Sequence, residues 1–178
     1  NRVRRQRQMC IRDRIYDKPL IYYPLSTLML AGIREILIIT TPQDSGSFKR
    51  LLGDGKSWGI EIQYAIQNNA EGVAHAFLIA ENFLKESPSA LILGDNLFYG
   101  NQLVNYMRVA DNDFDNSTIF TYPVKDPENY GVIQFDKNGN PSKIIEKPNY
   151  PISRFAITGL YFYDQTAINK TKTIKPSK

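Results

Sequence analysis

Short apolar runs alternate with segments of helical periodicity along this 178-residue chain, and this alternation limits the fold more than any other feature. Runs such as Glu35–Thr40 and Glu61–Ile66 are typical of buried strands, whereas Leu25, Leu28 and Ile33 recur at helical spacing. Strands and helices that alternate with short links form right-handed crossovers between parallel strands. The sequence therefore predicts an α/β fold, with a mainly parallel mixed sheet flanked by helices.

The same patterns give the expected bounds of the elements. Strands are expected at 35–40, 61–66, 91–93, 117–122, 130–135, 142–146 and 155–163, and helices at 23–32, 47–52, 72–83 and 102–110. Lys137, Asn138 and Gly139 provide a hairpin turn, so a late antiparallel hairpin is expected. We expect no closing helix after 155–163 and find no interdomain linker or internal repeat.

A carboxylate follows one of these apolar runs directly. Leu91-Ile92-Leu93 breaks at Gly94, and Asp95 comes next. Ligands of open α/β sheets collect beyond the carboxyl ends of the strands, so Asp95 is expected to face the ligand crevice. A carboxylate there can hold a divalent cation against phosphate oxygens. An aspartate at a strand end also caps the helix or turn that follows, and the motif alone leaves both roles open.

The formal net charge of +4 is concentrated at the amino-terminal end. The first 14 residues carry +5, and the others sum to −1. A basic segment without interleaved aromatic residues, joined to a balanced chain, does not indicate a nucleic-acid partner. No apolar run is long enough to span a bilayer, and no small-residue cleavage site follows the apolar segment 20–33. We therefore expect no membrane association and no signal peptide.

The segment 1–14 is unlike everything downstream in composition. Residues 5–14 resemble the translation of a sequencing adapter, so we interpret 1–14 as a non-native leader and 15–178 as a truncated domain. This interpretation sets aside Cys10, the one cysteine of the chain. A disulfide framework and a cysteine-ligated metal are then excluded. The lack of cysteine in 15–178 agrees with a reducing compartment, and a cytoplasmic location is expected.

Several segments in a fixed order carry a resemblance to a known family. They are 15–39, Leu51-Leu52-Gly53-Asp54-Gly55, Leu93-Gly94-Asp95-Asn96, Tyr130-Gly131-Val132, Glu146-Lys147-Pro148 and Thr158-Gly159-Leu160-Tyr161-Phe162-Tyr163-Asp164. From Ile15 to Lys178 the chain resembles the sugar-1-phosphate nucleotidyltransferases, and among them the thymidylyltransferase branch. The resemblance implies a Rossmann-like nucleotidyltransferase fold. It also implies nucleotidyl transfer from dTTP to glucose 1-phosphate, giving dTDP-glucose and diphosphate.

Mg²⁺ is the cofactor that the resemblance implies, with Asp95 as its ligand and as a catalytic residue. The attacking phosphate monoester is already a charged nucleophile. The protein therefore needs only to position two anions in line and to neutralise their repulsion. The resemblance also implies a homotetramer whose partners are two small molecules, dTTP and glucose 1-phosphate.

Gln67 and Gly72 match the family segment that receives the base. Gln67 has the donor and the acceptor needed to read a pyrimidine edge, and Gly72 lets backbone approach the ring closely. Without the family context, Gln67 is more simply a solvent-exposed loop amide. His75 stands where relatives commonly carry Gln, and we interpret it as a helix residue near the site.

Other positions match those that receive glucose 1-phosphate in the family. They are Gly131, Glu146, Lys147, Ile157 and Gly159, with Tyr161 packed beside the pocket. Glu146 can accept hydrogen bonds from sugar hydroxyls, and Lys147, assigned here as catalytic, offers a positive charge to the sugar phosphate. Both assignments have simpler alternatives, since adjacent charges are common on protein surfaces and an aromatic strand face is commonly core.

The departures from the family pattern lie at the two ends of the chain. The glycine-rich phosphate loop of the family belongs just upstream of Ile15, and a second Mg²⁺ carboxylate belongs beyond Lys178. We therefore interpret the chain as an internal fragment and expect it to be inactive or nearly so. Two alternatives stay open. One is a UTP- or ADP-glucose-type sugar nucleotidyltransferase, and the other is a non-catalytic sugar-nucleotide-binding or assembly module.

Overall fold

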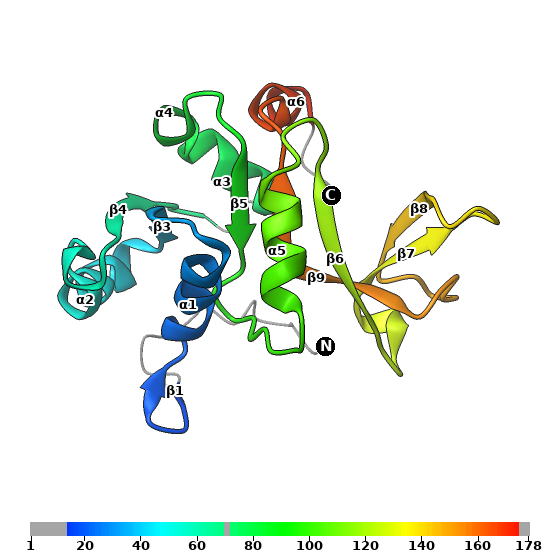
Figure 1. The fold of residues 1–178 in the computed structure, drawn as a ribbon, viewed down its shortest axis with the longest axis horizontal. Coiled ribbons are helices and arrows are strands. Elements are labelled where there is room, and N and C mark those ends of the chain that lie inside the picture. The colour runs from blue at the N-terminus through cyan, green and yellow to red at the C-terminus, as the bar shows by residue number, and fades with distance from the viewer. Residues whose placement is uncertain (1–13, 70–71, 175–178) are drawn as a thin grey trace.

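The computed structural model describes residues 14–69 and 72–174, so most of the segment interpreted as a leader lies outside the described residues. The strands are β1 (Arg14–Ile15), β2 (Lys18–Pro19), β3 (Glu35–Thr40), β4 (Glu61–Ile66), β5 (Ser89–Ile92), β6 (Thr118–Pro123), β7 (Gly131–Phe135), β8 (Pro141–Glu146) and β9 (Phe155–Tyr163) (Figure 1). The α-helices are α1 (Tyr22–Ala31), α2 (Pro42–Leu52), α3 (Val73–Ile79), α4 (Glu81–Leu84), α5 (Leu103–Asp111) and α6 (Ala167–Thr173). Two 3₁₀ turns, η1 (Lys56–Trp58) and η2 (Pro127–Asn129), complete the described elements.

Besides the short antiparallel pair of β1 and β2, the strands of the described chain form two sheets. β3 and β4 are parallel, joined through α2 as a βαβ unit. The other sheet has the order β5-β9-β7-β8, and β6 pairs with β9 as well. β9 is antiparallel to each of its neighbours β5, β6 and β7. This long strand is therefore the centre of the second sheet.

The predicted α/β class, with flanking helices and a late antiparallel hairpin, is confirmed by this architecture. The proportion of parallel pairing differs from the expectation, because β3–β4 is the one parallel pair among the described residues. The reason is β9, which returns across the sheet in the opposite direction to all three of its neighbours. Local periodicity predicts the strands but not the direction in which a strand pairs with neighbours that are distant in the sequence.

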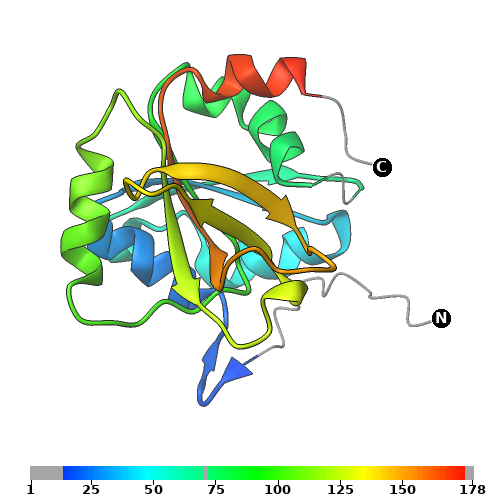
Figure 2. The same ribbon diagram turned by 90° about the vertical axis from the view of Figure 1, so that its right-hand side faces the viewer.

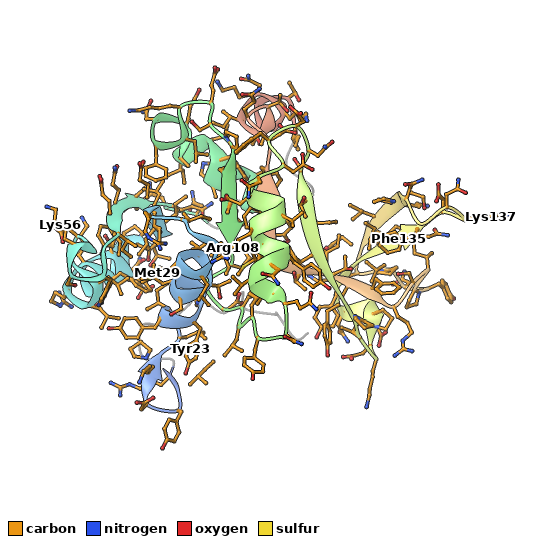
Figure 3. All side chains as sticks on the ribbon, viewed as in Figure 1. Tyr23, Met29, Lys56, Arg108, Phe135 and Lys137 are labelled. Atoms are coloured by element: carbon orange, nitrogen blue, oxygen red, sulfur yellow. The ribbon has the colours of Figure 1, made fainter. Side chains whose placement is uncertain are left out.

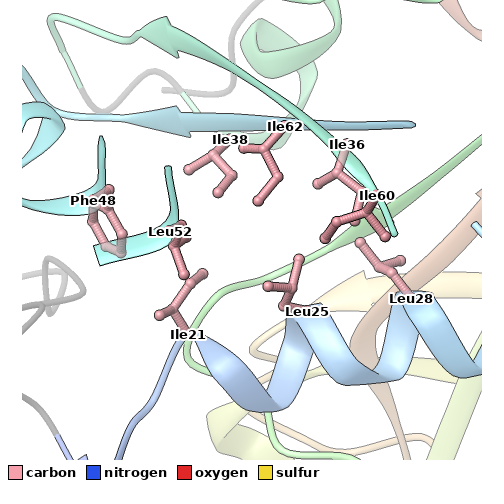
Figure 4. Close-up of a cluster of buried hydrophobic side chains, with 9 residues drawn as sticks. All are labelled: Ile21, Leu25, Leu28, Ile36, Ile38, Phe48, Leu52, Ile60 and Ile62. Carbon is pink, nitrogen blue, oxygen red and sulfur yellow. The ribbon is translucent and has the colours of Figure 1, made fainter. Parts of the chain in front are cut away.

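A cluster of buried aliphatic and aromatic side chains holds α1 and α2 against β3 and β4. Its members are Ile21, Leu25, Leu28, Ile36, Ile38, Phe48, Leu52, Ile60 and Ile62 (Figure 4). α1 ends where Gly32 adopts a left-handed backbone with φ of 101°, and its N–H donates to the Met29 carbonyl at 3.1 Å. Glycine adopts this conformation without a Cβ penalty, so Gly32 stops α1 and turns the chain into β3.

Side chains connect the two sheets. Ile33, Ala90 and Ile92 pack against the cluster under α1 and also against a second cluster. This second cluster contains Ala31, Met107, Ala110, Leu160 and Phe162, and it places α5 against β5 and β9. Apolar burial of this kind stabilises a fold in proportion to the area removed from water.

Two helices differ from the expected bounds by more than one residue. α2 begins at Pro42 instead of residue 47, because Thr41 caps it: the Thr41 hydroxyl accepts a hydrogen bond from the Asp44 N–H at 3.3 Å. A threonine cap followed by proline is a favourable helix start. The helix expected at 72–83 is divided into α3 and α4 at Ala80.

The carboxyl-terminal part contains a helix that the sequence interpretation did not predict. α6 follows Asp164, whose Oδ1 accepts a hydrogen bond from the Thr166 N–H at 2.7 Å. It packs on α3 (Figure 2). Phe77, Ala167 and Ile168 form a buried cluster on these two helices. The expectation that no helix closes this region was therefore wrong.

The described structure is elongated. Lys56, next to α2, and Lys137, at the tip of the β7–β8 hairpin, lie at opposite ends of its longest axis (Figure 3). None of the described helices is both long and apolar enough to cross a membrane.

Candidate functional site

β9 carries predicted site residues on one face and core residues on the other. Alternate residues of a strand point to opposite sides of the sheet, so Ile157, Gly159 and Tyr161 share a face. Leu160 and Phe162, on the other face, are buried in the cluster with α5. The pattern of one strand thus fixes the position of three predicted residues relative to the core.

Asp95 and Gly159 are joined through Asn96. The Asn96 amide donates to Asp95 Oδ1 at 2.9 Å, and its carbonyl oxygen accepts from the Gly159 N–H at 3.1 Å. The strand pairing continues up to this point, since the Leu93 N–H donates to the Gly159 carbonyl at 2.8 Å. The Asp95 carboxylate is exposed at this strand end. The structure therefore brings together the predicted metal ligand and a predicted sugar-binding glycine.

Gly131, Glu146 and Lys147 form a second group at the end of the β7–β8 hairpin. Gly131 pairs with Glu146, and a Cβ built on Gly131 would lie 2.8 Å from Glu146 Oε2. Lys147 Nζ lies 3.1 Å from Glu146 Oε1, with both side chains largely exposed. A carboxylate and an ammonium group therefore stand side by side where a polar ligand can reach both.

The backbone of Lys147 has an unusual conformation. Its φ is 42°, in the left-handed region that residues with a Cβ rarely adopt. The Lys147 N–H donates to the Tyr130 carbonyl at 3.0 Å, which holds this turn against the start of β7. Strained backbone of this kind occurs preferentially at functional sites.

Tyr161 is partly buried and lies close enough to Glu146 to be affected by its charge. Burial raises the pKa of the Tyr161 phenol above its ordinary value, and the negative charge of Glu146 raises it further. The Tyr161 ring stacks on Tyr163, with ring centroids 5.8 Å apart. Burial also raises the pKa of Tyr163 to about 12. Tyr161 is thus a neutral, half-buried phenol near the predicted sugar-binding carboxylate.

The residues predicted to receive the base lie at the end of β4 and at the start of α3. Gln67 follows β4, and its N–H donates to the Thr40 carbonyl at 2.9 Å. Gly72 precedes α3 with φ of 86° and ψ of 178°, a combination that is essentially restricted to glycine. Gln67 Nε2 lies 3.0 Å from Nδ1 of His75 in the first turn of α3. The two ends of this segment are therefore connected by a side-chain hydrogen bond.

The described residues contain no group of three or more histidine, cysteine, aspartate or glutamate side chains that could hold a metal ion. A magnesium ion needs fewer protein ligands, because it commonly binds through one or two carboxylates together with waters and substrate phosphates. The exposed Asp95 carboxylate, oriented by Asn96, fits that kind of binding. It does not form a closed structural metal site.

The sequence interpretation missed Asn96 as a site residue. It follows Asp95 directly, and a polar pair after an apolar strand was the available signal. Its contact with Gly159 could not be seen, because the two residues are 63 positions apart in the sequence.

The chain is similar to known proteins in sequence and in fold. The family model for nucleotidyl transferase matches residues 12–178. The glucose-1-phosphate thymidylyltransferase of Neisseria gonorrhoeae is 52% identical over 163 residues, which are 92% of this chain and 57% of that protein. The same enzyme of Xanthomonas campestris pv. campestris is 53% identical over 163 residues, or 92% of this chain and 55% of that protein.

A solved structure from Bacillus anthracis has a similar fold. That protein is provisionally named glucose-1-phosphate thymidylyltransferase and was crystallised with sucrose. It superposes with a TM-score of 0.82 at 32% identity, covering 90% of this chain and 64% of that one. The chain spans a little more than half the length of the two curated relatives.

Proposed function

The chain belongs to the nucleotidyl transferase family, and from that premise we propose that it serves to transfer a thymidylyl group from dTTP to glucose 1-phosphate. The products are dTDP-glucose and diphosphate. The observation that carries this proposal is the identity of 52–53% over 92% of the chain to two proteins named glucose-1-phosphate thymidylyltransferase. The exposed Glu146–Lys147 pair beside Gly131 supports it chemically.

In the proposed reaction, an oxygen of the glucose 1-phosphate attacks the α-phosphorus of dTTP, and the bond to the departing diphosphate breaks. Glu146 accepts hydrogen bonds from sugar hydroxyls, while Lys147 neutralises the sugar phosphate. An exposed ion pair contributes little to stability, so Lys147 can exchange the Glu146 carboxylate for a phosphate at low cost. Ile157, Gly159 and Tyr161 form the wall beside the sugar.

Base recognition is assigned to Gln67 and Gly72, and metal binding to Asp95. Gln67 presents an amide. Gly72 has no Cβ that would block the base, and its backbone conformation is one that glycine adopts readily. Bound Mg²⁺ would screen the charge of the phosphates, with Asp95 as the protein ligand. Asn96 would orient that carboxylate through its hydrogen bond to Oδ1.

The assembly and location of the protein are part of the same proposal. The family resemblance supports a homotetramer, which light scattering on the purified protein measures directly. A cytoplasmic location agrees with the lack of cysteine in 15–178 and is measured by cell fractionation.

The test combines binding and turnover. Calorimetry measures the affinity of the chain for dTDP-glucose, UDP-glucose and ADP-glucose. We expect dTDP-glucose to bind most tightly, and Lys147→Ala to weaken its binding by about tenfold, as for loss of a charge-assisted contact. Lys143→Ala is the matched control, because Lys143 is an exposed lysine on the same hairpin. It should leave the affinity unchanged.

Turnover is measured on the complete gene product, because the chain spans little more than half the length of its relatives. The protein is incubated with glucose 1-phosphate, Mg²⁺ and equal amounts of dTTP, UTP and ATP, and the nucleotide sugars are separated by chromatography. dTDP-glucose as the main product is the expected result. UDP-glucose or ADP-glucose as the main product would show that UTP or ATP, and not dTTP, is the nucleotide substrate. Binding without any turnover would favour a non-catalytic module.

A further inference from the structure

We propose that His75 is a positioning residue that fixes the orientation of the Gln67 amide, and that it thereby makes the base site prefer thymine and uracil to cytosine. This inference rests on the proposed function, in which Gln67 contacts the base. His75 supports the contact between Gln67 and the base. The feature of the base that the two residues would select is a protonated N3 on the pyrimidine ring.

The hydrogen bond between the two side chains determines their chemical states. Gln67 Nε2 lies 3.0 Å from His75 Nδ1. An amide nitrogen donates hydrogen bonds but does not accept them, so Nδ1 must be the acceptor. In this arrangement Nδ1 carries no proton, and Nε2 is the ring nitrogen that donates. His75 thus holds the Gln67 amide with its nitrogen toward the helix.

The elements that carry the two residues are both anchored. The Gln67 N–H is bonded to the Thr40 carbonyl at the end of β3. Phe77 follows His75 on α3, is buried, and makes an edge contact with Tyr163 at 4.8 Å between ring centroids. Both Gln67 and His75 are themselves half-buried. The hydrogen bond therefore joins two fixed points and restricts rotation of the amide.

A fixed amide presents one pattern of donor and acceptor. One amide hydrogen of Gln67 is directed to His75, so Oε1 and the second hydrogen are the groups that can contact a base. Thymine and uracil carry an N3–H donor beside a carbonyl acceptor, and this edge is complementary to Oε1 and N–H. Cytosine has an N3 acceptor beside an amino donor. To bind cytosine in the same way, the amide would have to rotate and present Oε1 to His75, and the imidazole would have to move its proton from Nε2 to Nδ1 to keep the hydrogen bond.

The experiment uses nucleosides, so that phosphate contacts do not contribute. Dissociation constants of thymidine and deoxycytidine are measured by ligand-observed NMR for the wild-type chain and for His75→Leu, His75→Asn and Gln67→Ala. We expect the ratio of the two constants to fall by about tenfold in His75→Leu, as for one lost hydrogen bond that selects between ligands. His75→Asn should keep the ratio, because the asparagine oxygen takes the place of Nδ1 as acceptor.

The outcomes separate this inference from the proposed function. Thymidine that does not bind the wild-type chain, or binds Gln67→Ala equally well, contradicts the proposed base site. A ratio that is the same in His75→Leu and wild type, while Gln67→Ala loses binding, overturns the role of His75 alone. A direct measurement remains even where a variant does not fold: the ¹⁵N chemical shifts of His75 in the wild-type chain. An Nδ1 protonated at neutral pH would overturn the inference, and an unprotonated Nδ1 supports it.

Discussion

Asn96 and Gly159 are in direct contact across 63 positions of sequence, with the Asn96 carboxamide lying where a side chain at Gly159 would be. A Cβ built on Gly159 would be 2.8 Å from Asn96 Cγ and Nδ2. The same carboxamide donates to Asp95. The proposed metal ligand, Asp95, and the proposed sugar-binding strand, β9, are therefore connected by hydrogen bonds through the Asn96 side chain.

Gly159→Ala should destabilise the protein by roughly 1–3 kcal/mol, as for other overpacked buried positions. Asn96 is short and hydrogen-bonded at both ends of its amide, so it cannot move aside without losing a contact. Urea unfolding measures the effect. Gly100→Ala is the matched control, because nothing lies within 4 Å of a Cβ at Gly100.

A second comparison shows whether the steric argument is correct. Replacing Asn96 by alanine makes room for the new Cβ, so Gly159→Ala should cost less in an Asn96→Ala background than in the wild type. Such non-additivity is expected for residues in contact. Equal costs in the two backgrounds would contradict the contact as described.

Gly131→Ala should behave differently, although the Cβ clash with Glu146 Oε2 has the same distance of 2.8 Å. The Glu146 side chain is largely exposed and can rotate away, so the free energy of unfolding should change by less than about 0.5 kcal/mol. The displaced carboxylate should weaken binding of glucose 1-phosphate by about tenfold. Calorimetry measures this affinity.

Glu146→Ala provides the reference for that loss. It should weaken binding of glucose 1-phosphate by a similar factor, and Gly131→Ala should add nothing in its background. A Gly131→Ala variant that binds the sugar phosphate as the wild type does would show that the position of Glu146 does not matter for binding.

The sequence predicted the local features of this fold well, because they depend on neighbouring residues. β9 has the expected bounds, and the β7–β8 hairpin turns at Gly139, whose φ is 82°. The turn is also held by Asp136, whose Oδ1 accepts a hydrogen bond from the Asn138 N–H at 2.8 Å. Short-range periodicity and turn chemistry are sufficient for such elements.

Contacts between distant residues could not be predicted from these patterns. The central place of β9 depends on pairing with Leu91 and Ile119, which are far from it in the sequence. Gln67 and His75 were both placed near the site, but periodicity gives no information about a hydrogen bond between side chains of a loop and a helix. The tertiary structure determines the pairing of β9 and the contact between Gln67 and His75, and local sequence patterns do not encode either.

Tyr163 should make stability depend on pH in the alkaline range. Burial raises its pKa from 10.0 to about 12, with a smaller contribution from the charge of Tyr161. A raised pKa in the folded state means that this contribution to stability is complete below pH 10 and is lost as the pH rises toward 12. At about pH 11 the loss should be about 1 kcal/mol.

Tyr163→Phe keeps the aromatic ring but has no proton to lose. Urea midpoints at about pH 8 and about pH 11 should therefore differ less in this variant than in the wild type. The same pH dependence in both proteins would mean that the Tyr163 phenol does not titrate with a raised pKa.

Lys147 should show a conflict between stability and binding. Its φ of 42° is costly for any residue with a Cβ, so Lys147→Gly should be more stable than Lys147→Ala by about 1 kcal/mol. Both variants remove the ammonium group and should lose affinity for glucose 1-phosphate equally. Lys143, within β8, provides the opposite control, because glycine in a strand is about 0.5–1 kcal/mol less stable than alanine. Glycine suits the backbone at position 147 better than lysine does, so the presence of a lysine there is best explained by a binding role of its charge. Equal stability of Lys147→Gly and Lys147→Ala would contradict this explanation.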